Sequence, residues 1–172
     1  CYHGIWRRER KHIICSSMTK KQNNYLYNCD QVRTLDRLAI DRDNISGLQL
    51  MQRAGKAVFK HILQHYPKYA ITVFCGSGNN GGDGYVIATL AKEKGIAVQL
   101  IHLKQPRQLK GDAKRAYKIA NEAGVLMADF SPEMALEDCV IIDALLGTGL
   151  KGSVKRTYLD AIELINNSSL EV

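Results

Sequence analysis

Apolar residues recur every three or four positions in the first part of this chain, and this spacing predicts two helices. The apolar stripe of the first helix consists of Val32, Leu35, Leu38 and Ala39, and that of the second consists of Leu50, Met51, Ala54, Val58 and Ile62. Ser46 is placed to cap the second helix, and Pro67 lies just beyond its end. Both stripes are expected to face the protein core.

From residue 71 onward, short apolar runs alternate with helical patterns. Strands are expected at residues 71–75, 97–103, 125–127 and 139–143. Helices are expected at residues 82–95, 111–124 and 158–167, and Ser131 and Pro132 are expected to open one further helical turn. Because strands and helices alternate and the strands are apolar at successive positions, the pattern predicts a Rossmann-like α/β fold. Its sheet would be doubly wound and mainly parallel, with helices on both faces.

A glycine-rich segment follows the first expected strand and is the most informative feature of the sequence about function. Residues 76–84 read Gly-Ser-Gly-Asn-Asn-Gly-Gly-Asp-Gly, so five glycines fall within nine positions. A turn between a strand and a helix N-terminus directs backbone N–H groups outward, where the helix dipole favours an anion such as phosphate. The two asparagines and the aspartate add side-chain oxygens that a plain phosphate loop does not need. The alternative is a glycine-rich turn that binds nothing.

Two familiar nucleotide-binding patterns fit this segment poorly. Gly76, Gly78 and Gly81 satisfy the Gly-x-Gly-x-x-Gly spacing of dinucleotide-binding folds, but that pattern also requires a carboxylate at the end of the next strand. The next strand runs into Lys104 instead, which disfavours a standard NAD-dependent dehydrogenase. No Gly-Lys-Ser or Gly-Lys-Thr follows the glycines, which disfavours a nucleoside-triphosphate P-loop. Lys104 itself either meets a phosphate or belongs to a solvated loop.

A second candidate site follows the last expected strand. Asp143 ends that strand and precedes the run Ala-Leu-Leu-Gly-Thr-Gly-Leu-Lys-Gly. Ligands of such sheets bind at the carboxyl ends of the strands, so Asp143 and the glycine-rich segment are expected at the same edge. A structural role, in which Asp143 caps the following turn, is the alternative. Asn80 and Asp143 could also supply hard oxygen ligands to a cation, which their spacing alone does not decide.

Charge and cysteine content narrow the class of protein. The 172 residues carry a formal net charge of +7, and residues 1–24 hold six basic residues against one acidic residue. We interpret residues 1–24 as a basic tail that is disordered or an artefact of the gene start, since Met18 is a plausible first residue; a transit peptide is the alternative. Residues 25–172 are expected to form one domain. The five scattered cysteines form no Cys-x-x-Cys pair, which disfavours disulfides and zinc and favours a cytoplasmic location.

Taken together, residues 76–84 and 141–150 resemble the YjeF N-terminal domain, the NAD(P)H-hydrate epimerase family. The second segment reads Ile-Ile-Asp-Ala-Leu-Leu-Gly-Thr-Gly-Leu, and residues 35–41 and 47–55 are similar to the family's two opening helices. The resemblance runs from about Val32 to the C-terminus. It implies a Rossmann-like fold and an isomerase for damaged cofactors. Such an enzyme interconverts the R and S epimers of hydrated NADH and NADPH (NADHX and NADPHX), so that a separate dehydratase can restore the cofactor.

The resemblance also implies roles for individual residues. The hydrated dinucleotide is expected to bind at Asn79, Asn80, Gly81, Gly82, Asp83, Gly147, Thr148, Gly149, Leu150, Lys151, Gly152 and Ser153. Asn80 and Asp143 match positions that hold a potassium ion, and Asp143 is also expected to be the acid/base residue. A homodimer is implied, whereas membrane and nucleic-acid partners are not.

Two further expectations come from the same resemblance. The family domain continues beyond residue 172 with a strand that ends in a motif containing Pro-Ser-Gly and an aspartate, so the chain is expected to be a fragment of that domain. Some eukaryotic relatives use the domain as a non-catalytic nucleotide-binding or dimerisation module, in mRNA decapping or lipoprotein binding. This module is the alternative to the enzyme.

Overall fold

The computed structural model describes residues 27–150 and 152–172, so the predicted basic tail lies outside the described residues. The helices are α1 (Cys29–Asp43), α2 (Gly47–His65), α3 (Asn79–Glu93), α4 (Gly111–Glu122) and α5 (Arg156–Asn167), with a 3-10 turn at Pro106–Gln108. The strands are β1 (Ala70–Cys75), β2 (Val98–His102), β3 (Leu126–Asp129) and β4 (Cys139–Ala144). None of these helices is both long enough and apolar enough to cross a membrane.

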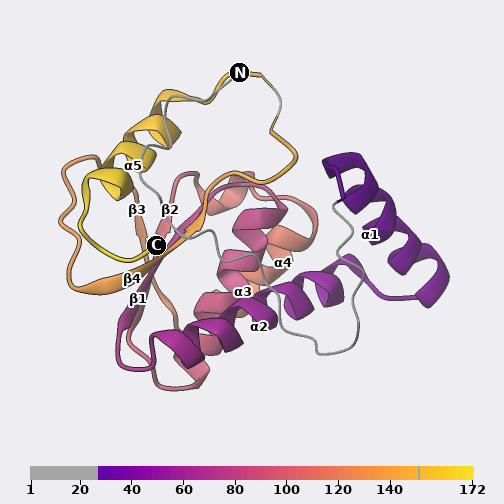
Figure 1. Ribbon diagram of the computed structural model, residues 1–172, viewed down its shortest axis with the longest axis horizontal. Coiled ribbons are helices and arrows are strands. Elements are labelled where there is room, and N and C mark those ends of the chain that lie inside the picture. Colours follow the sequence, from indigo (N-terminus) through magenta and orange to yellow (C-terminus); the bar gives the residue numbers. More distant parts are fainter. Residues whose placement is uncertain (1–26, 151) are drawn as a thin grey trace.

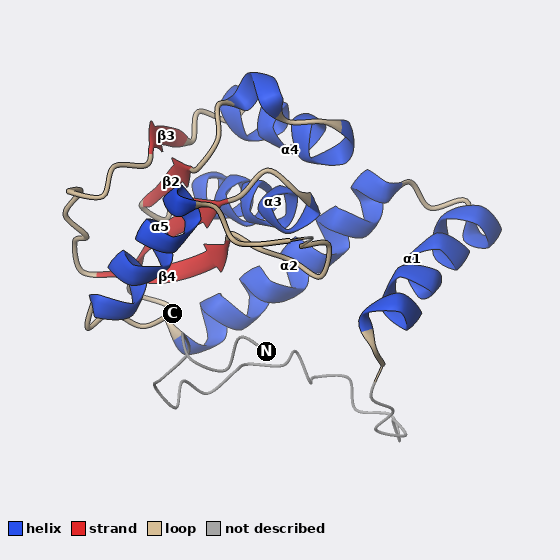
Figure 2. Cartoon of the chain, turned by 90° about the horizontal axis from the view of Figure 1, so that it is seen from above, coloured by secondary structure: helices blue, strands red, loops and turns tan. Residues whose placement is uncertain are grey.

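The four strands form one parallel sheet in the order β3-β2-β1-β4. The chain moves outward from β1 to β3 and then crosses back to place β4 on the other side of β1. This reversal of strand order is the switch point at which open α/β sheets bind their ligands. The predicted Rossmann-like α/β fold is confirmed, and Figure 2 shows helices on both sides of the strands.

Alternate side chains of the strands build two separate cores. Val73 and Leu100 belong to the core that α2, α3 and α4 cover. Phe74, Ile101 and Ile141 point to the opposite face, where α5 covers them. This alternation explains why the strands are apolar at successive positions, because both faces of a parallel sheet are buried.

The apolar stripe predicted for α2 is partly wrong. Ala54 and Val58 are exposed, and the buried residues of α2 are Met51, Gly55, Phe59 and Ile62. A Cβ atom added at Gly55 would lie 2.7 Å from Cγ1 of Val86 on α3. The two helices therefore approach each other closely at Gly55, on the buried face of α2.

The prediction that α1 buries its stripe is also wrong. Val32, Leu35 and Leu38 are 38%, 47% and 42% exposed. In Figure 1, α1 stands away from the sheet beyond the N-terminal end of α2, so no second layer covers this stripe within the described residues. The helix is instead defined by its ends: a reciprocal capping box of Asn28 and Gln31 begins it, and Asn44 ends it in the left-handed conformation.

Two smaller elements also differ from the sequence-based expectation. Ser131 and Pro132 open a turn and no helix, and the Ser131 hydroxyl binds the carboxylate of Glu133 at 2.6 Å. Helix α3 begins at Asn79, three residues earlier than expected. The glycine-rich segment is therefore not a free loop, because residues 79–84 form the first turns of α3.

Candidate functional site

The loop after β1 and the loop after β4 lie side by side, as the sequence predicts. Cys75 pairs with Ala144 at the ends of the two strands, and the Gly76 N–H donates to the Ala144 carbonyl at 3.0 Å. The Asn80 side chain then crosses between the loops, and its Nδ2 donates to the Leu146 carbonyl at 3.4 Å. The start of α3 is thus joined to the β4 loop by both backbone and side-chain hydrogen bonds.

A cavity of about 680 Å³ opens at this edge of the sheet. Eight of the predicted substrate contacts line it: Asn79, Asn80, Asp83, Gly147, Thr148, Gly149, Leu150 and Ser153. Gly81, Gly82 and Gly152 do not line it, and Lys151 lies outside the described residues. The volume is within the range of sites that hold small molecules and cofactors.

Gly81 and Gly82 are explained by packing within the protein. A Cβ atom at Gly81 would lie 2.1 Å from the Gly76 carbonyl oxygen, and one at Gly82 would lie 2.4 Å from Cε of Met51. Real Cβ atoms essentially never approach other atoms this closely. These glycines let α3 press against the β1 loop and against α2, so the group that approaches them closely is the protein itself.

Gly78 differs from these two glycines because it faces open space. It is the N-cap of α3, no side chain caps the helix there, and a Cβ atom at Gly78 would meet nothing within 4 Å. The amides of the first turn therefore have no capping side chain, and they lie where Gly78 and Asn79 line the cavity. A helix N-terminus of this kind attracts an anion through its free N–H groups and its dipole.

Asp83 is the carboxylate that α3 presents to the cavity. It is half-buried, and burial, followed by the negative charge of Asp36 on α1, raises the pKa of Asp83 to about 6. Asp36 lines the same cavity from the other side. A carboxyl group with a pKa near 6 exchanges its proton readily near neutral pH, which is the property that general acid–base chemistry uses.

Asp143 lies at the end of β4 but is not among the residues that line the cavity. Its side chain is half-buried, and Oδ1 accepts a hydrogen bond from the Leu145 N–H at 3.0 Å. This contact is the turn-capping role that the sequence left open as the alternative. This hydrogen bond does not by itself exclude another role, because a carboxylate has two oxygens and about four acceptor sites.

The donor atoms at this edge are suited to a cation that prefers oxygen. The carboxylate of Asp143 and the amide oxygen of Asn80 are hard donors, and the Asn80 amide nitrogen is turned toward the Leu146 carbonyl. No group of three or more histidine, cysteine or acidic side chains in the described residues could hold a metal. Carboxylate and amide oxygens are the ligand types that hard cations prefer.

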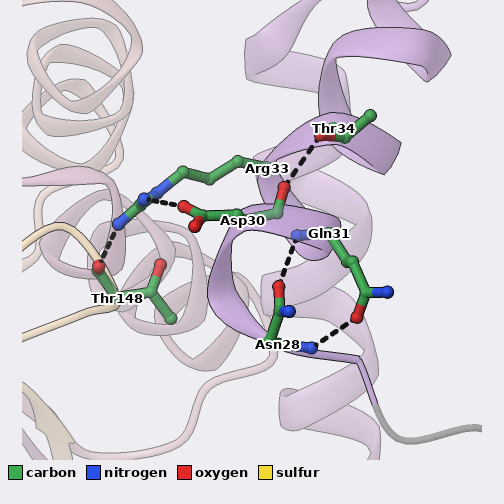
Figure 3. Close-up of polar contacts among 6 residues, drawn as sticks. All are labelled: Asn28, Asp30, Gln31, Arg33, Thr34 and Thr148. Atoms are coloured by element: carbon green, nitrogen blue, oxygen red, sulfur yellow. Dashed lines mark hydrogen bonds and ion pairs between the residues drawn. The ribbon is translucent and has the colours of Figure 1, made fainter.

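The sequence did not reveal the contribution of α1. Arg33 and Asp36 both line the cavity, and the Arg33 guanidinium donates to the Thr148 carbonyl while it pairs with Asp30 at 2.7 Å. Figure 3 shows this side chain reaching from α1 to the β4 loop. The apolar stripe identifies the helix but not which of its polar residues face a neighbour.

Three further residues with polar side chains line the cavity. Lys104 follows β2, and Lys155 and Tyr158 follow β4. Tyr158 is buried, and its hydroxyl accepts a hydrogen bond from the Ser77 N–H at 3.3 Å, which fixes the loop after β1. The sequence signalled Lys104 as a possible phosphate contact but gave no signal for Tyr158.

Comparison with curated proteins identifies close relatives of the chain. A bifunctional NAD(P)H-hydrate repair enzyme Nnr from Coxiella burnetii is 44% identical over 144 residues, which are 83% of this chain and 29% of that protein. The NAD(P)H-hydrate epimerases of Pirellula staleyi and Rhodopirellula baltica are 35% and 33% identical, over 84% and 82% of this chain. The chain spans 67% and 59% of those two proteins.

A solved structure and a family model also match the chain. The crystal structure of yeast ynu0 superposes with a TM-score of 0.67 at 22% identity and covers 82% of this chain and 64% of that one. This likeness concerns the fold alone. The family described as YjeF-related protein N-terminus matches residues 47–172, which include the whole sheet and both candidate loops. The chain therefore belongs to the YjeF-related N-terminal domain family.

Proposed function

We propose that this chain is the epimerase domain of a nicotinamide-cofactor repair enzyme and interconverts the R and S epimers of NADHX and NADPHX. The observation that carries the proposal is the 680 Å³ cavity, which combines a helix N-terminus suited to phosphate with carboxylates from α1 and α3. The names of relatives that are 33–44% identical support it.

Inversion of the hydroxyl-bearing ring carbon requires that a bond to this carbon breaks and re-forms on the opposite face. A carboxyl group that gives a proton to the departing oxygen, and takes a proton back when water returns, serves both halves of the reaction. We propose Asp143 for this role. Asp83 is the second candidate, because it lines the cavity and its pKa is raised to about 6.

The donor set at the carboxyl ends of β1 and β4 fits a potassium ion, with Asn80 and Asp143 as the side chains that would hold it. Such an ion supplies positive charge beside a developing oxyanion or a phosphate. The part played by the protein is to hold these oxygens in place, and the Asn80 hydrogen bond to the Leu146 carbonyl does so by orienting the amide.

The test of the activity is the rate at which pure R-NADHX and pure S-NADHX equilibrate, followed by chromatography. We expect the intact protein to bring both samples to the same mixture much faster than buffer alone. Equal rates with and without protein would exclude the enzyme and leave the alternative, a non-catalytic nucleotide-binding or dimerisation module.

The Asp143→Asn variant tests the catalytic assignment. We expect it to abolish epimerisation while nucleotide binding stays nearly intact, because the amide keeps an oxygen for the Leu145 N–H but cannot act as an acid or a base near neutral pH. Asp83→Asn is the matched comparison within the same cavity. Full activity in the Asp143 variant together with loss in the Asp83 variant would move the acid/base role to Asp83.

We also infer that the domain acts as a homodimer. The support is the exposed apolar stripe of α1, since Val32, Leu35 and Leu38 are more exposed than apolar residues of a covered helix. Sedimentation equilibrium of the intact protein tests this inference, and a monomeric mass at micromolar concentration would contradict it.

A further inference from the structure

The end of β2 is the position at which dinucleotide-binding folds distinguish the two nicotinamide cofactors. A carboxylate there binds the ribose 2′-hydroxyl of NAD, whereas a basic residue accommodates the 2′-phosphate of NADP. In this chain β2 ends at His102, and the side chain that follows into the cavity is Lys104. Lys104 is half-buried and makes no hydrogen bond or ion pair with any other described residue.

The carboxylate on the strand beside β2 has a partner outside the cavity. Asp129 ends β3, the strand beside β2, and pairs in register with His102. Its Oδ2 accepts a hydrogen bond from the Gln105 amide at 3.0 Å, and Asp129 does not line the cavity. Among the described residues, neither β2 nor β3 therefore contributes a carboxylate to the cavity wall that could select the 2′-hydroxyl.

The order of the strands gives the bound dinucleotide a direction. Strand β1 is central, with β2 on one side and β4 on the other. The open N-terminus of α3 follows β1 and suits the pyrophosphate in the middle. The adenosine ribose then lies toward β2 and Lys104, and the hydrated ring lies toward β4, where Asn80 and Asp143 are found.

The other charged side chains of the cavity lie on different elements. Arg33 comes from α1 and is paired with Asp30 and the Thr148 carbonyl, and Lys155 precedes α5 on the β4 side. The carboxylates Asp36 and Asp83 come from α1 and α3. Lys104 is thus the cation that the cavity presents at the end of β2.

We propose that Lys104 binds the adenosine 2′-phosphate and makes the site prefer the hydrated form of NADPH over that of NADH. This inference deepens the proposed function and rests on it. It assigns the cofactor preference to one side chain, and it assigns the two ends of the dinucleotide to opposite sides of β1.

The experiment compares kcat/KM for NADPHX and NADHX in the full-length protein and in Lys104→Gln and Lys104→Glu. We expect the ratio of the two values to fall about tenfold or more in Lys104→Gln, because a charge-assisted contact to phosphate is lost. It should fall further in Lys104→Glu, in which the new carboxylate repels phosphate. Lys110→Glu is the matched control, because Lys110 is an exposed lysine six residues further on, outside the cavity.

A binding measurement separates this inference from the proposed function. Titration calorimetry with 2′,5′-ADP and 5′-AMP needs no turnover, and we expect the wild type to bind 2′,5′-ADP more tightly and Lys104→Glu to lose that difference. If the protein does not epimerise but shows this pattern, the assignment of Lys104 stands and the proposed function falls. Equal binding of both nucleotides by the wild type, or an unchanged preference in Lys104→Glu, would overturn the assignment.

Discussion

Helices α1 and α3 have the same length, 15 residues, and each presents a carboxylate to the same cavity, yet the protein holds them in opposite ways. Nine residues of α3 are buried, whereas none of the described side chains of α1 is. Helix α3 is positioned by packing against β1, α2 and β4. Helix α1 has caps that define its ends, and Arg33 joins it to the β4 loop. One wall of the site is therefore rigid, and the other is joined to it by a few polar contacts.

The largest loss of stability is expected from a side chain added where α3 packs against the β1 loop. Gly81→Ala places a methyl group 2.1 Å from the Gly76 carbonyl oxygen, and this neighbour is backbone that cannot rotate away. We expect the free energy of unfolding to fall by about 3 kcal/mol, the upper end of the usual cost of overpacking. Urea denaturation followed by circular dichroism measures it.

Gly78→Ala is the control for this prediction, since it adds the same methyl group where nothing lies within 4 Å. Gly78 is an N-cap with a negative φ, so alanine costs less than about 1 kcal/mol there. Because alanine has the higher helix propensity, equal losses in the two variants would contradict the assignment of Gly81 to close packing.

The contrast between the buried elements and the exposed helix α1 also shows how much of the structure the sequence predicts. The ends of the strands were predicted within two residues, and for β1, β2 and β4 this is because burial on both faces makes the strand a largely apolar run. The meeting of the two loops was predicted because ligands of such sheets bind at the carboxyl ends of the strands, where both loops begin. The stripe of α1 was misread because periodicity reports that a helix is amphipathic and not whether another layer covers it.

The candidate site was predicted unevenly for a related reason. The sequence located Asn79, Asn80 and Asp83 because they interrupt a glycine run, an uncommon arrangement. It could not separate glycines that line a cavity, such as Gly147, from glycines that only pack, such as Gly81, since both lack a side chain. Residues from distant elements, such as Asp36 and Tyr158, carry no local signal, and only the folded chain brings them to the cavity.

The next largest effect is a pH dependence of stability that comes from Asp83. Its folded pKa, about 6, is above its usual value of about 4, so the folded state binds the proton more tightly than the unfolded state. Stability therefore falls as the pH rises from about 4 to 6 and then levels off. We expect the melting temperature of Asp83→Asn to exceed that of the wild type by a margin that widens across this range and stays constant above it.

Asp36→Asn sharpens this prediction, because Asp36 is the second cause of the raised pKa after burial. The difference in melting temperature caused by Asp83→Asn should then reach half of its final value at a lower pH. The difference itself should remain. If the pH of this half-value does not change, α1 does not hold its carboxylate close to α3 in solution, and the cavity wall that α1 provides is open.

The smallest effect on stability, and the most direct test of α1, is expected from Arg33→Ala. The Arg33 side chain is 48% exposed, so loss of its ion pair with Asp30 and of its hydrogen bond to Thr148 should cost about 1 kcal/mol or less. The effect of Arg33→Ala on the mobility of the β4 loop should be larger than its effect on overall stability. The Leu150 amide, which donates to the Gly147 carbonyl at 3.3 Å in the same loop, should exchange its hydrogen severalfold faster.

Arg37→Ala is the matched control for that measurement, because Arg37 is an exposed arginine of the same helix whose side chain makes no hydrogen bond or ion pair with another described residue. It should leave exchange at Leu150 unchanged. Equal exchange rates in both variants would mean that Arg33 does not hold the β4 loop. Faster exchange in the Arg33 variant alone would show that an exposed helix, with no buried side chain to anchor it, still controls the mobility of the loop that forms the opposite side of the cavity.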